Sequence, residues 1–231
     1  RMTLDGAVNK TAIMLAVLVS TAAISWNFSS PLISLVTVIG IFAATISSFI
    51  TFGLWIPFIG FILNPRPHLA PKTWLIFAAG EGFLIGSISL TFETMFPGIV
   101  LEAVSLTFCV AATLLFLYKS GLVKPTQNFV LMVCSAIFGI MLFYVGIFIY
   151  TLVTGTSPEI FSGSGNFSIG LSLFVVGLAA LSLVLDFDII EQSAERGAPK
   201  YMEYFGAMAL VTTLIWLYIE ILRLLAKFRS R

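Results

Sequence analysis

The amino-acid sequence predicts an all-α polytopic membrane protein with seven transmembrane helices. The chain of 231 residues is 59% hydrophobic and only 10% charged, with a mean hydropathy of +1.06. Soluble domains, by contrast, are about 25% charged. Apolar runs of about 20 residues recur along the chain, which is the length of a helix that crosses a bilayer. A transmembrane barrel would instead alternate apolar and polar residues. We therefore expect one helical domain over residues 1–231, in contact with the lipid bilayer.

The first span is predicted over residues 8–26. Thr3 or Asp5 is suited to cap its amino-terminal end, because both side chains accept hydrogen bonds from free backbone N–H groups. Residues 1–10 lead straight into this full-length span, without the pattern of a cleavable signal peptide. The first residue is Arg1 and not Met, so we expect the natural chain to be longer.

The second span is predicted to begin near Pro31, since proline is well tolerated in the first turn of a helix. The apolar run that follows, residues 32–63, is too long for one upright span. We expect it to tilt, protrude or break, with Gly53 and Pro57 as the points where it breaks or kinks.

Five further apolar segments complete the predicted helices. Short loops that contain glycine, proline or charged residues separate them. The segments are residues 72–96, 99–118, 125–153, 167–190 and 201–222.

The distribution of Lys and Arg predicts the orientation, because cytoplasmic loops are enriched in these residues. The loops after the first, third and fifth spans contain none, whereas two such residues lie in or directly beside each of the loops after the second, fourth and sixth: Arg66 and Lys72, Lys119 and Lys124, and Arg196 and Lys200. The N-terminus is therefore predicted to be cytoplasmic. The basic C-terminus conflicts with an odd number of crossings, so segment 201–222 either crosses against the charge preference or enters and returns. Its length favours crossing.

Two carboxylates lie near the end of the sixth span, Asp186 and Asp188. An ionised Asp at the centre of a bilayer costs about 2.5–3.5 kcal/mol on insertion scales. The two residues lie about 200° apart around a helix, so they cannot share a face. Asp188 shares its face with Glu191, toward water, whereas Asp186 shares its face with Ser182 and is expected to point inward. The alternative is that both lie among the lipid headgroups, where charge is tolerated.

Arg66 and Lys72 are the basic residues closest to Asp186 in predicted depth. A carboxylate buried beside a cation can form an ion pair, and protonation would break that pair. This arrangement predicts a pH-dependent latch at the cytoplasmic mouth.

Glu81 is the deepest acidic residue, in the middle of the third span between Gly80 and Gly82. The glycines would let neighbouring helices approach closely. Two interpretations stay open for Glu81. It is either a cation or proton site on a central path, or a neutral carboxyl group that hydrogen-bonds to a neighbouring helix.

Two further glutamates are candidates for an ion path. Glu220 lies near the end of the last segment, where Arg223 could pair with it at i+3, and this structural interpretation is the favoured one. Glu102 lies near the outer surface and would either line an outer vestibule or simply face water.

Other classes of function find little support in the sequence. The chain carries 12 Lys and Arg against 11 Asp and Glu, so nothing predicts nucleic-acid binding. Cys109, Cys134 and His68 have no metal-like spacing, and we expect neither a metal site nor a disulfide. Hydrolase and nucleotide-binding motifs are missing, which predicts a protein without enzymatic activity and without a cofactor.

Four stretches with ordered polar residues resemble the Bax inhibitor-1 family, also called transmembrane Bax inhibitor motif proteins, and its bacterial branch in particular. They are GIVLEAVSLTF (98–108), GLAALSLVLDFDIIE (177–191), RGAPKYME (196–203) and LYIEILRLL (217–225). The resemblance runs over essentially the whole chain. It implies a seven-helix fold with the last helix central and the other six around it, in the bacterial inner membrane. It also implies a pH-sensitive calcium leak.

In that family, an aspartate on the sixth helix and one on the seventh form a pair that an arginine near the end of the second can engage. Asp186 matches the first aspartate and Arg66 matches the arginine. Thr213 stands where the second aspartate should be, so the pair departs from the family pattern. Glu81, Asp188 or Glu220 would have to substitute, or this branch lacks the same pH response.

Two functions follow from this resemblance and these residues. The first is an ion channel that lets calcium leak passively, gated by the protonation of Asp186. The second is a regulator that binds other membrane proteins, such as a membrane-anchored protease.

Overall fold

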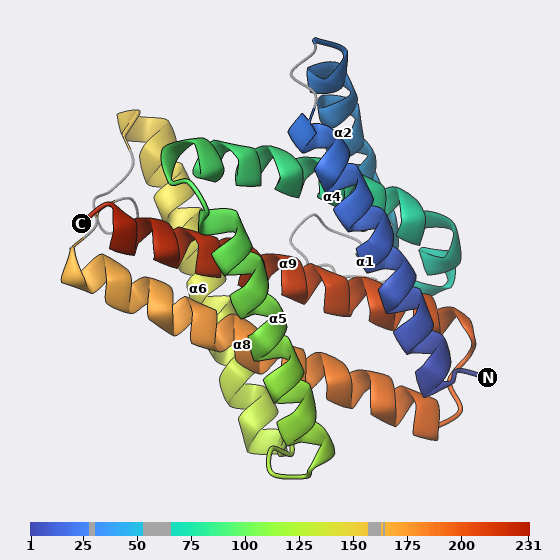
Figure 1. Ribbon diagram of the computed structural model, residues 1–231. Coiled ribbons are helices and arrows are strands. Elements are labelled where there is room, and N and C mark those ends of the chain that lie inside the picture. Colours follow the sequence, from blue (N-terminus) through green and yellow to red (C-terminus); the bar gives the residue numbers. More distant parts are fainter. Residues whose placement is uncertain (28–30, 53–65, 157–162, 164) are drawn as a thin grey trace. The chain divides into compact units, whose positions relative to one another are not determined.

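The computed structural model describes residues 1–27, 31–52, 66–156, 163 and 165–231, and it is helical throughout, with no strand among them (Figure 1). Six helical segments in this part of the chain are long and apolar enough to cross a membrane, and Val38–Ser47 in α2 adds a shorter apolar stretch. The predicted class, an all-α polytopic membrane protein, is therefore confirmed. The elements are α1 (Leu4–Asn27), α2 (Pro31–Phe52), η1 (Pro67–Leu69), α4 (Ala70–Met95), α5 (Ile99–Lys119), α6 (Gln127–Thr154), α8 (Asn166–Glu195) and α9 (Tyr201–Arg229).

Two helices continue beyond the apolar runs that predicted them. The predicted spans 167–190 and 201–222 are the apolar parts of α8 and α9, whose helices extend to Glu195 and Arg229. Residues 191–195, which follow the predicted span 167–190, are thus helical. Hydropathy marks the stretch that suits hydrocarbon, whereas backbone hydrogen bonds continue through charged residues in water.

Of the two helix starts that were predicted at a proline, one is confirmed and the other is wrong by two residues. Pro31 is the first residue of α2, as predicted. Pro125 was expected to begin the fifth span, but α6 begins at Gln127. The cap is Thr126, whose Oγ1 accepts a hydrogen bond from the backbone N–H of Phe129 at 3.2 Å. The predicted break at Gly53 or Pro57 lies outside the described residues.

The last segment forms one continuous helix, α9, of 29 residues. It is long and apolar enough to cross a membrane. An element that enters and returns would need a break in the middle, and α9 is continuous. That it crosses the membrane stays a prediction.

The chain forms two compact units. The first unit contains Arg1–Thr94 and Asp186–Thr212, and the second contains Met95–Leu185 and Thr213–Arg231. The boundaries fall inside α8 and α9, so each of these helices contributes one part to each unit.

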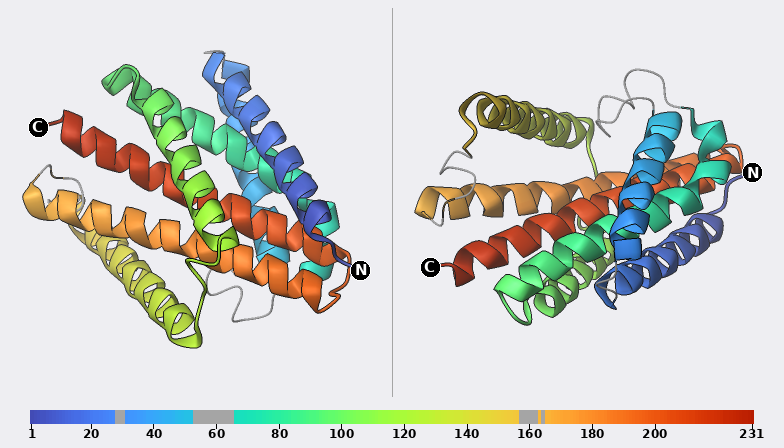
Figure 2. Two further views of the ribbon diagram at one scale, coloured as in Figure 1. Left: turned by 60° about the horizontal axis from the view of Figure 1, so that its bottom comes forward. Right: turned by 90° about the horizontal axis from the view of Figure 1, so that it is seen from above.

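Glycines of α4 bring three helices of the first unit into close contact (Figure 2). A Cβ added at Gly80 would overlap Gly40 and Ala44 of α2, and one added at Gly82 would overlap Leu18 and Thr21 of α1. The predicted close approach around Glu81 is confirmed, and small residues at these positions make it possible.

Candidate functional site

Asp186 is half-buried in α8, and its Oδ2 atom is shielded from solvent. The residues that share its face, among them Ala179, Ser182 and Ile190, are buried. The predicted inward face of this helix is therefore the buried face. An acidic group is thus held within a helix that is apolar enough to span a membrane.

Asp188 lies in a polar ladder along α8. Gln192 Nε2 donates to Asp188 Oδ2 at 2.6 Å, and Arg196 donates to Gln192 Oε1 at 2.9 Å. The three side chains stand four residues apart and lead toward the turn between α8 and α9. Asp188 and Glu191 were expected to face water, and both are half-buried. The i+4 spacing from Asp188 to Gln192 is a sequence signal that could have predicted this contact.

Arg66 directly precedes η1, and its side chain is exposed. Its backbone N–H donates to the carbonyl of Thr51 at 3.0 Å. Thr51 is itself buried and shares a hydrogen bond of 2.6 Å with the Thr73 hydroxyl, which ties the end of α2 to α4. None of the ion pairs among the described residues joins Arg66 to Asp186. Their pairing stays a prediction.

Glu81 is half-buried in α4, in the first unit. Trp74 lies about two helical turns earlier on the same face, and its ring meets that of Tyr204 in α9 edge-on at 5.1 Å. Phe77 and Ile85, one turn before and after Glu81, are both buried. Glu81 thus lies beside a packed interior, which fits both interpretations offered for it.

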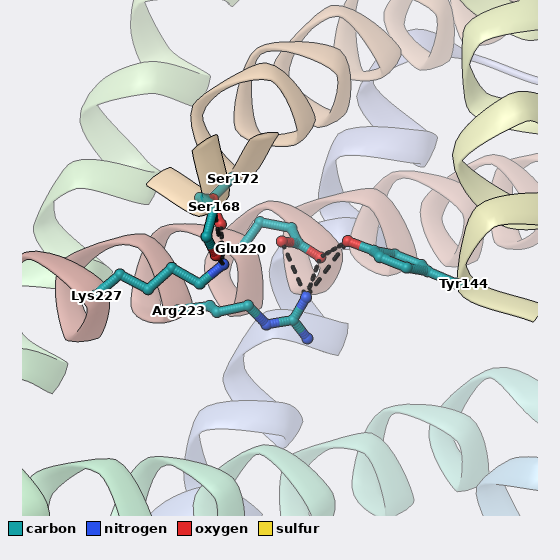
Figure 3. Close-up of polar contacts among 6 residues, drawn as sticks. All are labelled: Tyr144, Ser168, Ser172, Glu220, Arg223 and Lys227. Carbon is teal, nitrogen blue, oxygen red and sulfur yellow. Dashed lines mark hydrogen bonds and ion pairs between the residues drawn. The ribbon is translucent and has the colours of Figure 1, made fainter. Parts of the chain in front are cut away.

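A buried polar cluster in the second unit is centred on Glu220 (Figure 3). Tyr144 of α6 donates to Glu220 Oε1 at 3.0 Å, and Arg223 Nη1 lies 3.2 and 3.3 Å from the two carboxylate oxygens. The predicted i+3 pair with Arg223 is confirmed. Tyr144 was missed, because nothing in the sequence relates it to a residue on a distant helix.

Lys227 extends this cluster and was also missed. Its Nζ donates to Ser168 Oγ at 2.7 Å, to Ser172 Oγ at 2.8 Å and to the Ser168 carbonyl at 3.3 Å (Figure 3). The side chain is buried, and three acceptors match the three N–H donors of the ammonium group. The two serines stand four residues apart on α8, a spacing that forms a small polar face inside an apolar helix.

Glu102 and Thr213 lie in the second unit. Glu102 is exposed in the first turn of α5, where Arg229 Nη2 donates to it at 2.6 Å. Arg229 also donates to the carbonyl of Pro97 at 2.7 Å. Glu102 therefore joins the start of α5 to the end of α9, and its vestibule role stays a prediction. Thr213 is half-buried in α9.

The candidate ion-path residues thus differ in their surroundings. Glu220 and Glu102 each pair with an arginine, whereas no ion pair within the described ranges involves Glu81. Those ranges also contain no group of three His, Cys, Asp or Glu side chains that could hold a metal ion.

The comparison with protein families agrees with the resemblance noted in the sequence. A family model described as Bax inhibitor 1 like matches residues 1–230. A search of curated proteins found no match to the chain.

Proposed function

The chain belongs to the Bax inhibitor 1 like family, and from that premise we propose that it is a membrane channel through which calcium leaks passively. The observation that carries the proposal is the half-buried carboxylate of Asp186, with Oδ2 shielded from solvent, inside a membrane-spanning helix. Such a group is costly in hydrocarbon and typically marks an ion or proton pathway. Calcium is a hard cation that prefers oxygen ligands, which carboxylates supply.

Asp186 is the gating residue in this proposal. When its carboxylate is charged, it attracts neighbouring donors and cations and so holds the adjacent helices together. Protonation removes that attraction and loosens the closure.

Glu81 is the best second carboxylate, because Thr213 occupies the position of the family's second aspartate. It lies in the first unit with Asp186 and takes part in no ion pair in the described part of the chain. Glu220 is less suited, since Arg223 and Tyr144 already engage it. We place the protein in the bacterial inner membrane, with the N-terminus in the cytoplasm.

Calcium flux into proteoliposomes tests the proposal. We expect wild-type protein to pass calcium faster than empty vesicles do, with a rate that rises as the pH is lowered, because protonation loosens the closure. Asp186→Asn should flatten this pH dependence, because the amide cannot titrate. Glu191→Gln, which lies about 140° around α8 from Asp186, is the matched control and should keep the pH dependence.

Two results would end the leak proposal. One is a wild-type rate equal to that of empty vesicles at every pH. The other is an equal effect of Asp186→Asn and Glu191→Gln, which would contradict the inward placement of Asp186. Co-purification of a membrane-anchored protease with a protein that passes no calcium would favour the alternative, a regulator of other membrane proteins.

A further inference from the structure

Glu203 is a buried acidic residue that plays no part in the proposed leak. It lies in the first turn of α9, and its side chain is 2% exposed. Its carboxylate Oε1 accepts hydrogen bonds from the backbone N–H of Thr3 at 3.0 Å and from the Thr3 hydroxyl at 3.1 Å. Its Oε2 lies 3.8 Å from Lys10 Nζ. All of these groups belong to the first unit.

The contacts at Thr3 have the form of a helix cap that is completed by another helix. Thr3 directly precedes α1, and its Oγ1 accepts a hydrogen bond from the backbone N–H of Gly6 at 3.0 Å. In a capping box, a glutamate at the third helical position reaches back to the backbone N–H of the cap residue. In this chain the third position is Gly6, and Glu203 of α9 accepts that hydrogen bond instead.

Gly6 provides the space that this arrangement requires. A Cβ added there would overlap the carboxyl group of Glu203. Glycine is a poor helix former, so its position in the first turn of α1 is unfavourable when that helix is considered alone. The contact with Glu203 explains why a side chain is missing at this point.

The position of the carboxylate also explains how its charge is tolerated. It lies in the first turn of its own helix, α9, and at the amino-terminal end of α1, and both helix ends carry partial positive charge. Lys10 adds a full positive charge, and its ammonium lies 4.9 Å from the centroid of the Tyr204 ring. The buried Glu203 carboxylate is thus stabilised by three positive charges or partial charges: the amino-terminal end of α9, the amino-terminal end of α1, and Lys10.

The residues before α1 rest on the turn between α8 and α9 (Figures 1 and 2). The backbone N–H of Met2 donates to the carbonyl of Ala198 at 2.7 Å. Met2 and Ala7 are buried and form an apolar cluster with Ile190 of α8. The amino-terminal segment is therefore held by packing and by one backbone hydrogen bond in addition to Glu203.

We infer that Glu203 caps α1 in trans and thereby latches the first turns of α1 onto the α8–α9 turn. The carboxylate is the polar centre of this latch, because it engages the cap residue Thr3 and the cation Lys10 together. Removal of this carboxylate loosens residues 1–10 as one segment, while the second unit keeps its structure.

Hydrogen exchange of the full chain in lipid nanodiscs tests the latch. Glu203→Ala should speed exchange in peptides that cover residues 1–10 by about fivefold to tenfold, as expected for loss of a cap. The amides of Thr3, Gly6 and Ala7 report it directly, since they donate within the cap. Glu195→Ala removes an exposed glutamate of α8 and is the matched control, with unchanged exchange expected.

A swap of the capping group separates the latch from a general loss of packing. Gly6→Glu combined with Glu203→Ala places the glutamate in cis at the third helical position, where it completes an ordinary capping box with Thr3. We expect exchange in residues 1–10 to return toward the wild-type rate. Exchange that stays as fast as in Glu203→Ala alone would overturn the inference.

Gly6→Ala alone supplies a test in which Glu203 stays in place. Helix propensity predicts slower exchange in the first turn of α1, because alanine favours the helix. The latch predicts faster exchange, because the new methyl group displaces the Glu203 carboxylate. Slower exchange in Gly6→Ala, or wild-type exchange in Glu203→Ala, would refute the latch.

Discussion

At the scale of single residues, charged groups inside this protein are stabilised by a few specific partners. Glu220 illustrates this, since its buried carboxylate lies within hydrogen-bond distance of Tyr144 and Arg223. The removal of one partner of a buried ion pair is more costly than the removal of both, because it leaves a charge without compensation.

We therefore predict that Arg223→Met lowers the free energy of unfolding by about 1–3 kcal/mol, less than for a fully buried pair because the Arg223 side chain is 27% exposed. Glu220→Gln together with Arg223→Met should lower it by less, because no uncompensated carboxylate remains. The measurement is reversible unfolding in mixed detergent micelles. Glu220→Gln alone completes the cycle, and a double variant that loses as much as the two single variants together would show that the pair is not coupled.

The same residues show which contacts the sequence could predict. The i+3 relation of Glu220 to Arg223 is local, so helix geometry alone brings the two side chains together. Tyr144 with Glu220, Ser168 with Lys227, and Thr3 with Glu203 join residues that are distant in the chain. Such contacts depend on how helices pack, and a single sequence does not encode that packing in any local pattern.

At the scale of helices, hydropathy predicted where the spans lie but not where the helices end. The apolar part of α8 was located closely, yet the helix continues to Glu195 through charged residues. The close approach at Gly80 and Gly82 was predicted from the glycines themselves. A residue without a side chain lets another helix backbone come near. Which helices meet there required the structure.

We predict that Gly82→Ala destabilises the protein by about 1–3 kcal/mol, the usual range for overpacking. The added methyl group would overlap Leu18 and Thr21 of α1. Gly139 of α6 is the matched control, because a Cβ there meets nothing within 4 Å. Gly139→Ala should leave stability unchanged or raise it through helix propensity. Equal losses at the two positions would show that the contact between α1 and α4 does not limit stability.

At the scale of the whole molecule, the basic residues near the C-terminus bear on whether α9 crosses the membrane. The positive-inside preference acts on Lys and Arg near the ends of membrane spans. In this protein those side chains are engaged within the second unit. Arg223 contacts Glu220, Lys227 contacts Ser168 and Ser172, Arg229 contacts Glu102, and Arg231 contacts Asn166.

Since these contacts hold the basic side chains at the end of α9, we predict that α9 crosses the membrane despite its charges. The C-terminus should then lie outside and the N-terminus inside. Fusions to alkaline phosphatase, which is active only outside the inner membrane, and to green fluorescent protein, which fluoresces inside, distinguish the two ends. We expect phosphatase activity from C-terminal fusions and fluorescence from N-terminal fusions. The same reporter active at both ends would mean an even number of crossings, and α9 would then have to lie in the membrane without spanning it.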